Sequence, residues 1–203
     1  STAQQTALNL KAATTVTDDH ETRISDNETV IATLPSSGST NTAYGYGSGE
    51  GANYNVAVGY NVGNAMTTCV GNTLLGYGCG TTIASTNGNT LVGYLCNNAG
   101  TARSNNTCVG YESGRTPGGN RIVTLGKAAG KTIGSGSVAL GCQALELSST
   151  TATNNVAVGD WSSQNLTGNY STTVGYQSGK DQTTANNNVL IGKNAGLSTS
   201  PSG

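Results

Sequence analysis

Charged residues are scarce in this sequence of 203 residues: Asp, Glu, Lys and Arg together supply 9% of it, and the formal net charge is −1. Soluble domains usually carry roughly 25% charged residues. With so little net charge, we expect neither nucleic acid nor an anionic membrane surface as a partner. No apolar run approaches the ~20 residues that a membrane-crossing helix needs, so we also expect no membrane insertion.

Metal-binding and disulfide chemistry are limited by how few suitable side chains there are. His20 is the only histidine, and the five cysteines are an odd number, which excludes a complete set of intrachain disulfides. None of the cysteines forms a CxxC pair, so we expect no zinc site. We interpret the cysteines as small, buried packing residues made in a reducing compartment. They are Cys69, Cys79, Cys96, Cys108 and Cys142.

Catalytic groups are equally scarce beyond residue 40. No nucleophile–His–acid set can form there, because the only histidine lies outside this region. Cleavage of a glycoside needs two facing carboxylates, and the acidic residues of the repeats share no position, although a pair could still meet across subunits. We predict that the chain is not an enzyme and has no cofactor. The acidic residues are Glu50, Glu112, Glu146, Asp160 and Asp181.

Glycine, by contrast, is abundant at 30 residues, and ten of these glycines mark a repeat. One copy reads Asn89-Thr90-Leu91-Val92-Gly93-Tyr94, and related copies recur at steps of 14 to 18 residues. Such a period is typical of solenoids and other repeat architectures. The anchor glycines of the ten copies are Gly45, Gly59, Gly76, Gly93, Gly110, Gly126, Gly141, Gly159, Gly175 and Gly192.

Three columns of residues precede the anchor glycines and predict a short β-strand in every copy. The first column, three residues before the anchor, is Thr42, Val56, Thr73, Thr90, Thr107, Val123, Val138, Val156, Thr172 and Val189. The third column, one residue before it, is Tyr44, Val58, Leu75, Val92, Val109, Leu125, Leu140, Val158, Val174 and Ile191. Alternate residues of a strand share a face, and we predict that these two columns face the core. The middle column is then predicted to face the opposite way: Ala43, Ala57, Leu74, Leu91, Cys108, Thr124, Ala139, Ala157, Thr173 and Leu190.

Turn residues flank each predicted strand. A second glycine column lies four residues after the anchors, where we expect a backbone with positive φ or a close approach to a neighbour. It comprises Gly49, Gly63, Gly80, Gly114, Gly130, Gly179 and Gly196, with Asn97, Leu145 and Ser163 as exceptions. Before the strand, an asparagine column holds a turn position where we expect the amide to bond its own backbone. It comprises Asn41, Asn55, Asn72, Asn89, Asn106, Asn155 and Asn188.

A single copy cannot bury its apolar columns alone, so stacked copies must bury them together. We therefore predict an all-β fold over residues 41–197: a parallel β-roll or β-helix solenoid of about ten rungs. A low charge agrees with stacking, because a charge repeated in one column would lie beside its like at every rung.

The N-terminal region has a different, seven-residue period. Leu10, Thr17, Ile24 and Ile31 fall at one core position of a heptad, and Ala13, His20, Asn27 and Leu34 at the other. This pattern predicts a short coiled coil, with a single amphipathic helix or a disordered arm as alternatives. We predict an N-terminal arm and stalk at residues 1–34, a linker at 35–40, the head at 41–197 and a tail at 198–203.

The copies at residues 55–59, 137–141 and 155–159 (Asn-Val-Ala-Val-Gly, Ser-Val-Ala-Leu-Gly and Asn-Val-Ala-Val-Gly) resemble the head repeats of trimeric autotransporter adhesins. Similar repeats occur in tail-fibre and spike proteins of phages and large DNA viruses. The resemblance implies a left-handed roll, three chains assembled side by side, and a trimeric coiled-coil stalk. It also implies that Asn27 could form a core layer around an anion, with His20 as a second polar layer. Five cysteines favour a viral or phage fibre over a secreted adhesin.

A tyrosine column directly follows the anchor glycines and is the predicted binding site. It comprises Tyr46, Tyr60, Tyr77, Tyr94, Tyr111 and Tyr176, interrupted by Lys127, Cys142, Asp160 and Lys193. A row of aromatic faces suits carbohydrate, whereas the same rings could instead cover the turn or fill a subunit junction. Trp161 is a further candidate. We predict a homotrimeric viral fibre or spike on the virion surface that attaches to a host receptor, expected to be a glycan. The alternatives are a bacterial adhesin head at the cell surface, a non-binding spacer and an ice-binding solenoid.

Overall fold

The structure is a computed structural model that describes residues 41–49, 53–99, 103–184 and 186–197. The predicted coiled coil, with its core residues His20 and Asn27 and its possible anion layer, lies outside these residues. The same holds for the predicted linker and tail.

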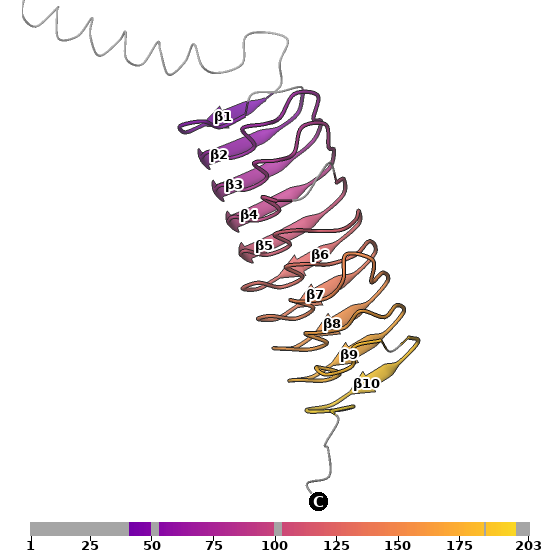
Figure 1. The fold of residues 1–203 in the computed structure, drawn as a ribbon. Helices are drawn as coiled ribbons and strands as arrows, with labels where there is room; N and C mark the ends of the chain where they lie inside the picture. The colour runs from indigo at the N-terminus through magenta and orange to yellow at the C-terminus, as the bar shows by residue number, and fades with distance from the viewer. Residues whose placement is uncertain (1–40, 50–52, 100–102, 185, 198–203) are drawn as a thin grey trace, which may run out of the picture. The chain divides into compact units, whose positions relative to one another are not determined.

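The described residues form ten short strands, one at each predicted copy of the repeat. They are β1 (Thr42–Tyr44), β2 (Val56–Tyr60), β3 (Thr73–Tyr77), β4 (Thr90–Tyr94), β5 (Thr107–Tyr111), β6 (Val123–Leu125), β7 (Val138–Leu140), β8 (Val156–Val158), β9 (Thr172–Val174) and β10 (Val189–Ile191). The strands build one parallel sheet in chain order, β1 to β10 (Figure 1). The prediction of an all-β parallel solenoid is confirmed.

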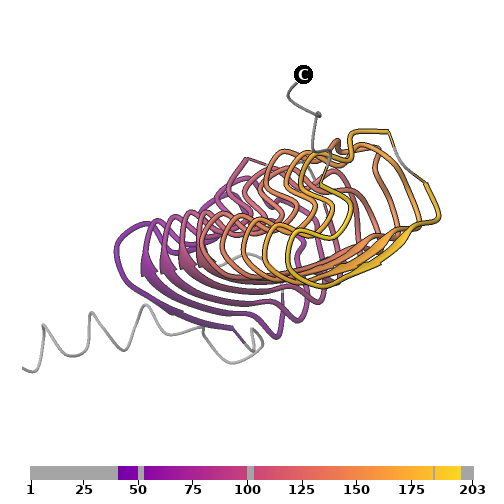
Figure 2. The same cartoon turned by 90° about the horizontal axis from the view of Figure 1, so that it is seen from below.

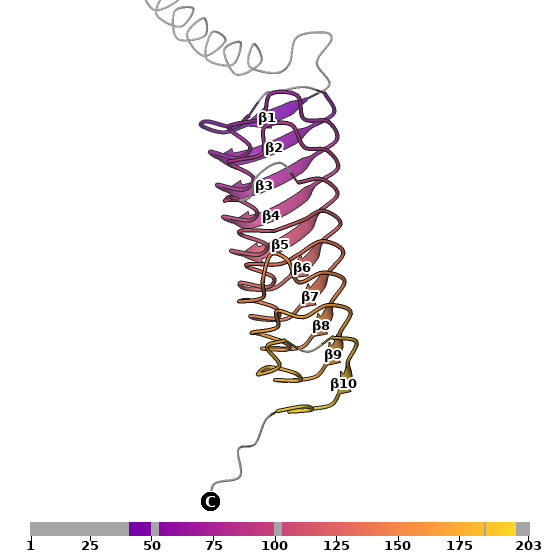
Figure 3. The same cartoon turned by 45° about the vertical axis from the view of Figure 1, so that its right-hand side comes forward.

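Equivalent residues of neighbouring copies pair with one another along the whole sheet. Thr73 is paired with Thr90, Leu74 with Leu91, and Tyr77 with Tyr94, and the same register holds from β1 to β10. Successive turns therefore lie behind one another when the stack is viewed from below (Figure 2). The strands line one side of the stack, and the connecting segments return along the other side (Figure 3).

The predicted orientation of the strands is wrong, because the middle column faces the core. Ala57, Leu74, Leu91 and Cys108 of this column are all buried, whereas the first and third columns of the same strands are exposed or half-buried. Each turn encloses only a narrow interior, and the strand contributes one inward residue flanked by two outward ones. The β-branched residues of the first column lie on the pleated outer surface, where β-branched side chains are favoured.

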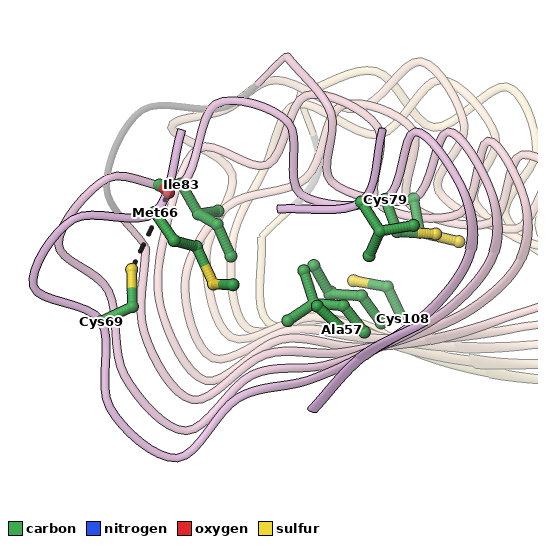
Figure 4. Packing of buried hydrophobic residues seen from close by; sticks show 10 residues of the cluster. Ala57, Met66, Cys69, Cys79, Ile83 and Cys108 are labelled. Carbon is green, nitrogen blue, oxygen red and sulfur yellow. Dashed lines mark hydrogen bonds between the residues drawn. The ribbon is translucent and has the colours of Figure 1, made fainter. Parts of the chain in front are cut away.

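The core is filled from both walls of the solenoid. In the N-terminal half, Ala57 and Cys108 point inward from the strands, and Cys79 points inward from the opposite wall (Figure 4). Met66 and Ile83 fill the wider end of the same interior. A second cluster, around Ile122, Ile133, Leu145 and Leu166, continues the core through the C-terminal half.

Glycine is required at the anchor positions by contact between turns. The anchors have φ between 120° and 135°, and a β-carbon on Gly93 would overlap the carbonyl oxygen of Gly110 in the next turn. Positive φ is also confirmed in the second glycine column, where it ranges from 46° at Asn97 to 68° at Gly196. The exception is Gly49, for which no positive φ occurs.

The asparagine column forms a ladder between turns. Asn72 Oδ1 accepts hydrogen bonds from the backbone N–H and the Nδ2 group of Asn89, at 2.9 and 3.0 Å. Its own Nδ2 donates to Asn55 Oδ1 at 2.9 Å and to the carbonyl oxygen of Thr86 at 2.8 Å. The prediction that these amides bond their own turn is therefore wrong for Asn72: its amide links three successive turns, because the in-register stack places equivalent asparagines directly above one another.

Candidate interaction surface

The outer face of the sheet consists of the first and third columns, and no charged residue occurs in either. Leu75 and Leu125 are 47% and 52% exposed, and at the last strand Val189 and Ile191 are about 70% exposed. The columns run in register across all ten strands. A contiguous apolar surface of this kind marks a site of protein association, ligand binding or aggregation.

The tyrosine column borders the outer face over the first five turns. In β2 to β5 the tyrosine is the last strand residue and pairs in register with its neighbour, as Tyr60 does with Tyr77. We call Tyr46, Tyr60, Tyr77, Tyr94 and Tyr111 the tyrosine ladder. Ring centroids of consecutive members lie 5.0 to 5.4 Å apart, and the planes of the rings differ by 6° to 20°. Their exposed fractions range from 40% at Tyr94 to 79% at Tyr46.

These distances determine which part of each ring is accessible. Two nearly parallel rings that lay edge to edge could not have centroids 5 Å apart, because their carbon atoms would then come much closer than the roughly 3.5–4.0 Å of van der Waals contact. The rings are therefore offset and stacked, as aromatic pairs prefer. Tyr60, Tyr77 and Tyr94 each have a neighbouring ring over both faces. The ladder presents hydroxyl groups and ring edges, and the predicted row of open aromatic faces is wrong.

Trp161 belongs to a separate aromatic group at the other end of the sheet. Its ring centroid lies 6.0 Å from that of Tyr176, with the planes tilted by 33°, and Lys180 Nζ lies 4.7 Å from the centroid of the indole ring. The indole Nε1–H donates to Gln143 Oε1. Lys127, Cys142 and Asp160 occupy the tyrosine column between the two groups, so the seven predicted binding residues form two clusters.

A polar cluster beside Trp161 was not predicted from the sequence. Glu146 Oε2 accepts hydrogen bonds from Gln143 Nε2 at 2.6 Å and from Gln164 Nε2 at 2.9 Å. These residues come from two neighbouring turns, and neither glutamine occupies a column of uniform residue type. The alignment of neighbouring loops brings the three side chains together. No repeated residue type marks these positions, so the sequence could not predict the cluster. Amide and carboxylate groups can form hydrogen bonds with hydroxyl groups of a ligand, and an aromatic ring beside them offers an apolar contact surface.

An ion-pair cluster lies directly after the last residue of the tyrosine ladder. Glu112 contacts Arg115 at 2.8 Å and Lys131 at 3.3 Å, and its side chain is 15% exposed. Both cations hold the carboxylate of Glu112 in place. These ion pairs hold the loop at the end of the tyrosine ladder. Both partners of Glu112 in them are cations, so they do not supply the second carboxylate that glycoside cleavage needs.

Four of the five cysteines are buried, as the sequence predicted, and Cys142 is half-buried. Burial raises the pKa of the Cys108 thiol to about 11. The thiol–thiol hydrogen bond to Cys79, together with burial, raises the pKa of Cys96 far above its ordinary value. The Cys96 and Cys108 thiols are therefore neutral at physiological pH and pack as small apolar groups.

The described residues contain neither a candidate metal site nor a candidate membrane span. No group of three or more His, Cys, Asp and Glu side chains there is arranged to hold a metal ion. In that same part of the chain no helix has the length and hydropathy needed to cross a membrane. Comparison with protein-family models, with curated proteins and with solved structures finds no match.

Proposed function

We propose that this chain is the head of a homotrimeric viral or phage fibre or spike, a structural protein without catalytic activity that attaches to a host-surface receptor. Such a protein is located on the virion surface. The observation that supports this proposal most directly is the apolar outer face, which lacks charge over ten strands. As part of the proposal, the solenoid is left-handed and residues 1–34 form a trimeric coiled coil.

Copies of the same chain are the partner that the outer face fits best. Every turn presents the same pair of outward positions, so a second copy in parallel orientation meets matching columns at each level. Three copies arranged around an axis form a closed assembly, whereas an open arrangement would continue to add chains. The heptad pattern of residues 10–34 agrees with association in the same orientation.

The receptor is proposed to be a carbohydrate bound at the edges of the solenoid. The tyrosine ladder offers a row of phenol hydroxyls at the spacing of the turns. The cluster of Trp161, Gln143 and Glu146 combines an aromatic ring with amide and carboxylate groups. Hydroxyl-rich ligands can bind both through hydrogen bonds, and the indole ring adds an apolar contact.

Sedimentation of the full chain in native buffer tests the trimer. We expect a trimer for the wild-type chain, and a shift toward monomer for Leu75→Glu because a charge would be buried in the interface. Leu147→Glu is the matched control, since Leu147 is also exposed but lies outside the strands. A wild-type monomer at micromolar concentration would contradict the proposal.

Glycan-array binding tests attachment separately from assembly. Trp161→Ala and Tyr94→Ala should each lower binding, while Tyr170→Ala, which changes an exposed tyrosine outside the tyrosine column, should not. A wild-type trimer that binds neither glycans nor host cells would favour the alternative of a structural spacer without a receptor. Retained binding after both substitutions would place the receptor site elsewhere.

Ice binding is a second candidate, because the first column faces outward. Thr73, Thr90 and Thr107 form an exposed threonine row on three neighbouring strands. An ice-binding solenoid needs this row to stay open to water, whereas the trimer covers it. A monomer that slows ice recrystallisation, and loses this activity in Thr90→Tyr, would favour ice binding over attachment.

A further inference from the structure

The tyrosine ladder brings five phenol rings into a stack that the backbone keeps in place. Parallel pairing sets Tyr60, Tyr77, Tyr94 and Tyr111 one strand apart. Tyr46 extends the stack at its N-terminal end, with its ring 5.4 Å from that of Tyr60. Consecutive ladder tyrosines are therefore 14 to 17 residues apart along the chain, but their rings are in direct contact in space.

Stacked phenols have a specific reactivity. Removal of one electron and one proton from tyrosine leaves a phenoxyl radical whose unpaired spin is shared with the two carbons next to the hydroxyl-bearing carbon, Cε1 and Cε2. When two such radicals are neighbours, these carbons can join. Rings held in contact are also far more reactive toward each other than rings that must meet by diffusion.

We infer that the tyrosine ladder is a site of oxidative cross-linking, in which consecutive ladder tyrosines become dityrosine when a haem peroxidase and hydrogen peroxide act on the protein. Each of two phenols loses one hydrogen atom, and one carbon–carbon bond forms between their Cε atoms. The hydrogens on these two carbons then move to the oxygens, which restores both aromatic rings. The two electrons and two protons that are lost reduce one molecule of peroxide to two molecules of water.

Exposure of the ladder agrees with this chemistry. At least 40% of every ladder tyrosine is exposed, so the phenol hydroxyls are accessible to an oxidant. Beyond Tyr111 the next place in the tyrosine column is taken by Lys127, which has no phenol. The cross-linking site therefore ends at Tyr111. Each new bond would join two turns covalently along the exposed edge.

Treatment of the full-length chain with a haem peroxidase and hydrogen peroxide tests the inference, with peptide mapping by mass spectrometry as the readout. We expect linked peptides that pair consecutive ladder tyrosines, each lighter by two hydrogen atoms, at several-fold higher yield than any link involving Tyr170. The yield should not change on dilution, because the bonds form within one chain. Urea should reduce it to the level of Tyr170 because unfolding removes the stack.

Two substitutions make the result specific. Tyr77→Phe keeps the stacked ring but removes the phenol, so the 60–77 and 77–94 links should disappear while the 46–60 and 94–111 links remain. Tyr170→Phe removes an exposed tyrosine outside the ladder and should leave all ladder links unchanged. Links that form mainly between chains, or that pair ladder tyrosines no more often than Tyr170, would overturn the inference. The outcome does not depend on the proposed attachment function.

Discussion

At the scale of single residues, the anchor glycines are the positions where the solenoid tolerates least change. Gly93 combines a φ of 134° with a backbone contact across the turns that leaves no room for a β-carbon. Gly71 also has positive φ, at 69°, but has no atom within 4 Å of the place where a β-carbon would lie. Comparing substitutions at Gly93 and Gly71 therefore distinguishes the cost of a positive φ from the cost of a steric overlap with the next turn.

Gly93→Ala should lower the free energy of unfolding by about 3 kcal/mol or more, because it adds a steric overlap to an unfavourable backbone conformation. Gly71→Ala should cost only about 1–2 kcal/mol, the conformational part alone. Urea unfolding followed by circular dichroism measures both. Equal losses for the two variants would mean that the contact between the anchor glycines contributes nothing.

Because the pKa of the Cys108 thiol is raised in the folded chain, we expect the protein to lose stability at alkaline pH. Burial raises its pKa from 9.0 to about 11, so between these values the unfolded chain releases the proton while the folded chain keeps it. The unfolded state then binds fewer protons, and stability falls as pH rises. The wild-type chain should lose on the order of 2 kcal/mol more than Cys108→Ala between pH 9 and pH 11.

Unfolding in the presence of a reductant at both pH values gives this difference. Alanine is a suitable replacement because Ala57 and Ala139 occupy the same middle column. Parallel pH profiles for the wild-type and Cys108→Ala chains would show that Cys108 does not titrate with the proposed pKa.

At the scale of the structural element, each turn is held to the next by backbone pairing on the strand side, and from Asn41 to Asn106 also by the asparagine ladder beside it. The ladder is buried, so the hydrogen bonds that its amides make have no replacement from water. Asn72 makes four such bonds to residues of the two neighbouring turns, counting two accepted and two donated.

Asn72→Ala should lower the free energy of unfolding by about 2–4 kcal/mol, since it removes the acceptor of the Asn89 backbone N–H and the amide donor to the Thr86 carbonyl in a buried site. Asn64→Ala is the control, because Asn64 is exposed and should change stability by less than about 0.5 kcal/mol. Thermal unfolding of the two variants under one condition provides the comparison. A loss as small as that of Asn64→Ala would contradict the structural role of the ladder.

The strands themselves could be predicted because a β-branched residue, an apolar residue and a glycine recur at fixed spacing. Their orientation could not be predicted from apolarity alone, since Leu74 in the middle column is as apolar as Leu75 in the third. The tyrosine column held the missing signal: Tyr77 shares its parity with Thr73 and Leu75, and a row of large polar-tipped rings does not fit a narrow core. The grouping of Trp161 with Gln143 and Gln164 depends on how the loops of neighbouring turns align. The sequence does not show this alignment, because these loop positions hold different residue types in different copies.

At the scale of the whole solenoid, stability should depend on position along the stack, because each strand pairs only with the strands of the two neighbouring turns. Leu91 lies in the middle column of β4 between two other turns and is fully buried. Leu190 holds the equivalent place in β10, the last strand of the sheet, and is half-buried.

Leu91→Ala should cost about 3–5 kcal/mol, the range for a buried leucine that leaves a cavity. Leu190→Ala should cost less than half as much, since this side chain loses less contact with its neighbours. Native-state hydrogen exchange should show the β10 amides opening at lower free energy than those of β4. Uniform protection from β4 to β10 would mean that the described solenoid opens as one unit.

The register of the sheet has a consequence for how such a chain can change in length. Steps between anchors vary from 14 to 18 residues, yet the strands remain paired in the same register throughout. Each turn advances the stack by about 4.8 Å whatever the size of its loops. Duplication of one complete copy should therefore extend the head by a fixed increment, and deletion of one copy should shorten it by the same increment, without disturbing the turns on either side. A gene encoding this protein can be edited in whole repeats, and the length of the head reports the number of repeats rather than the number of residues.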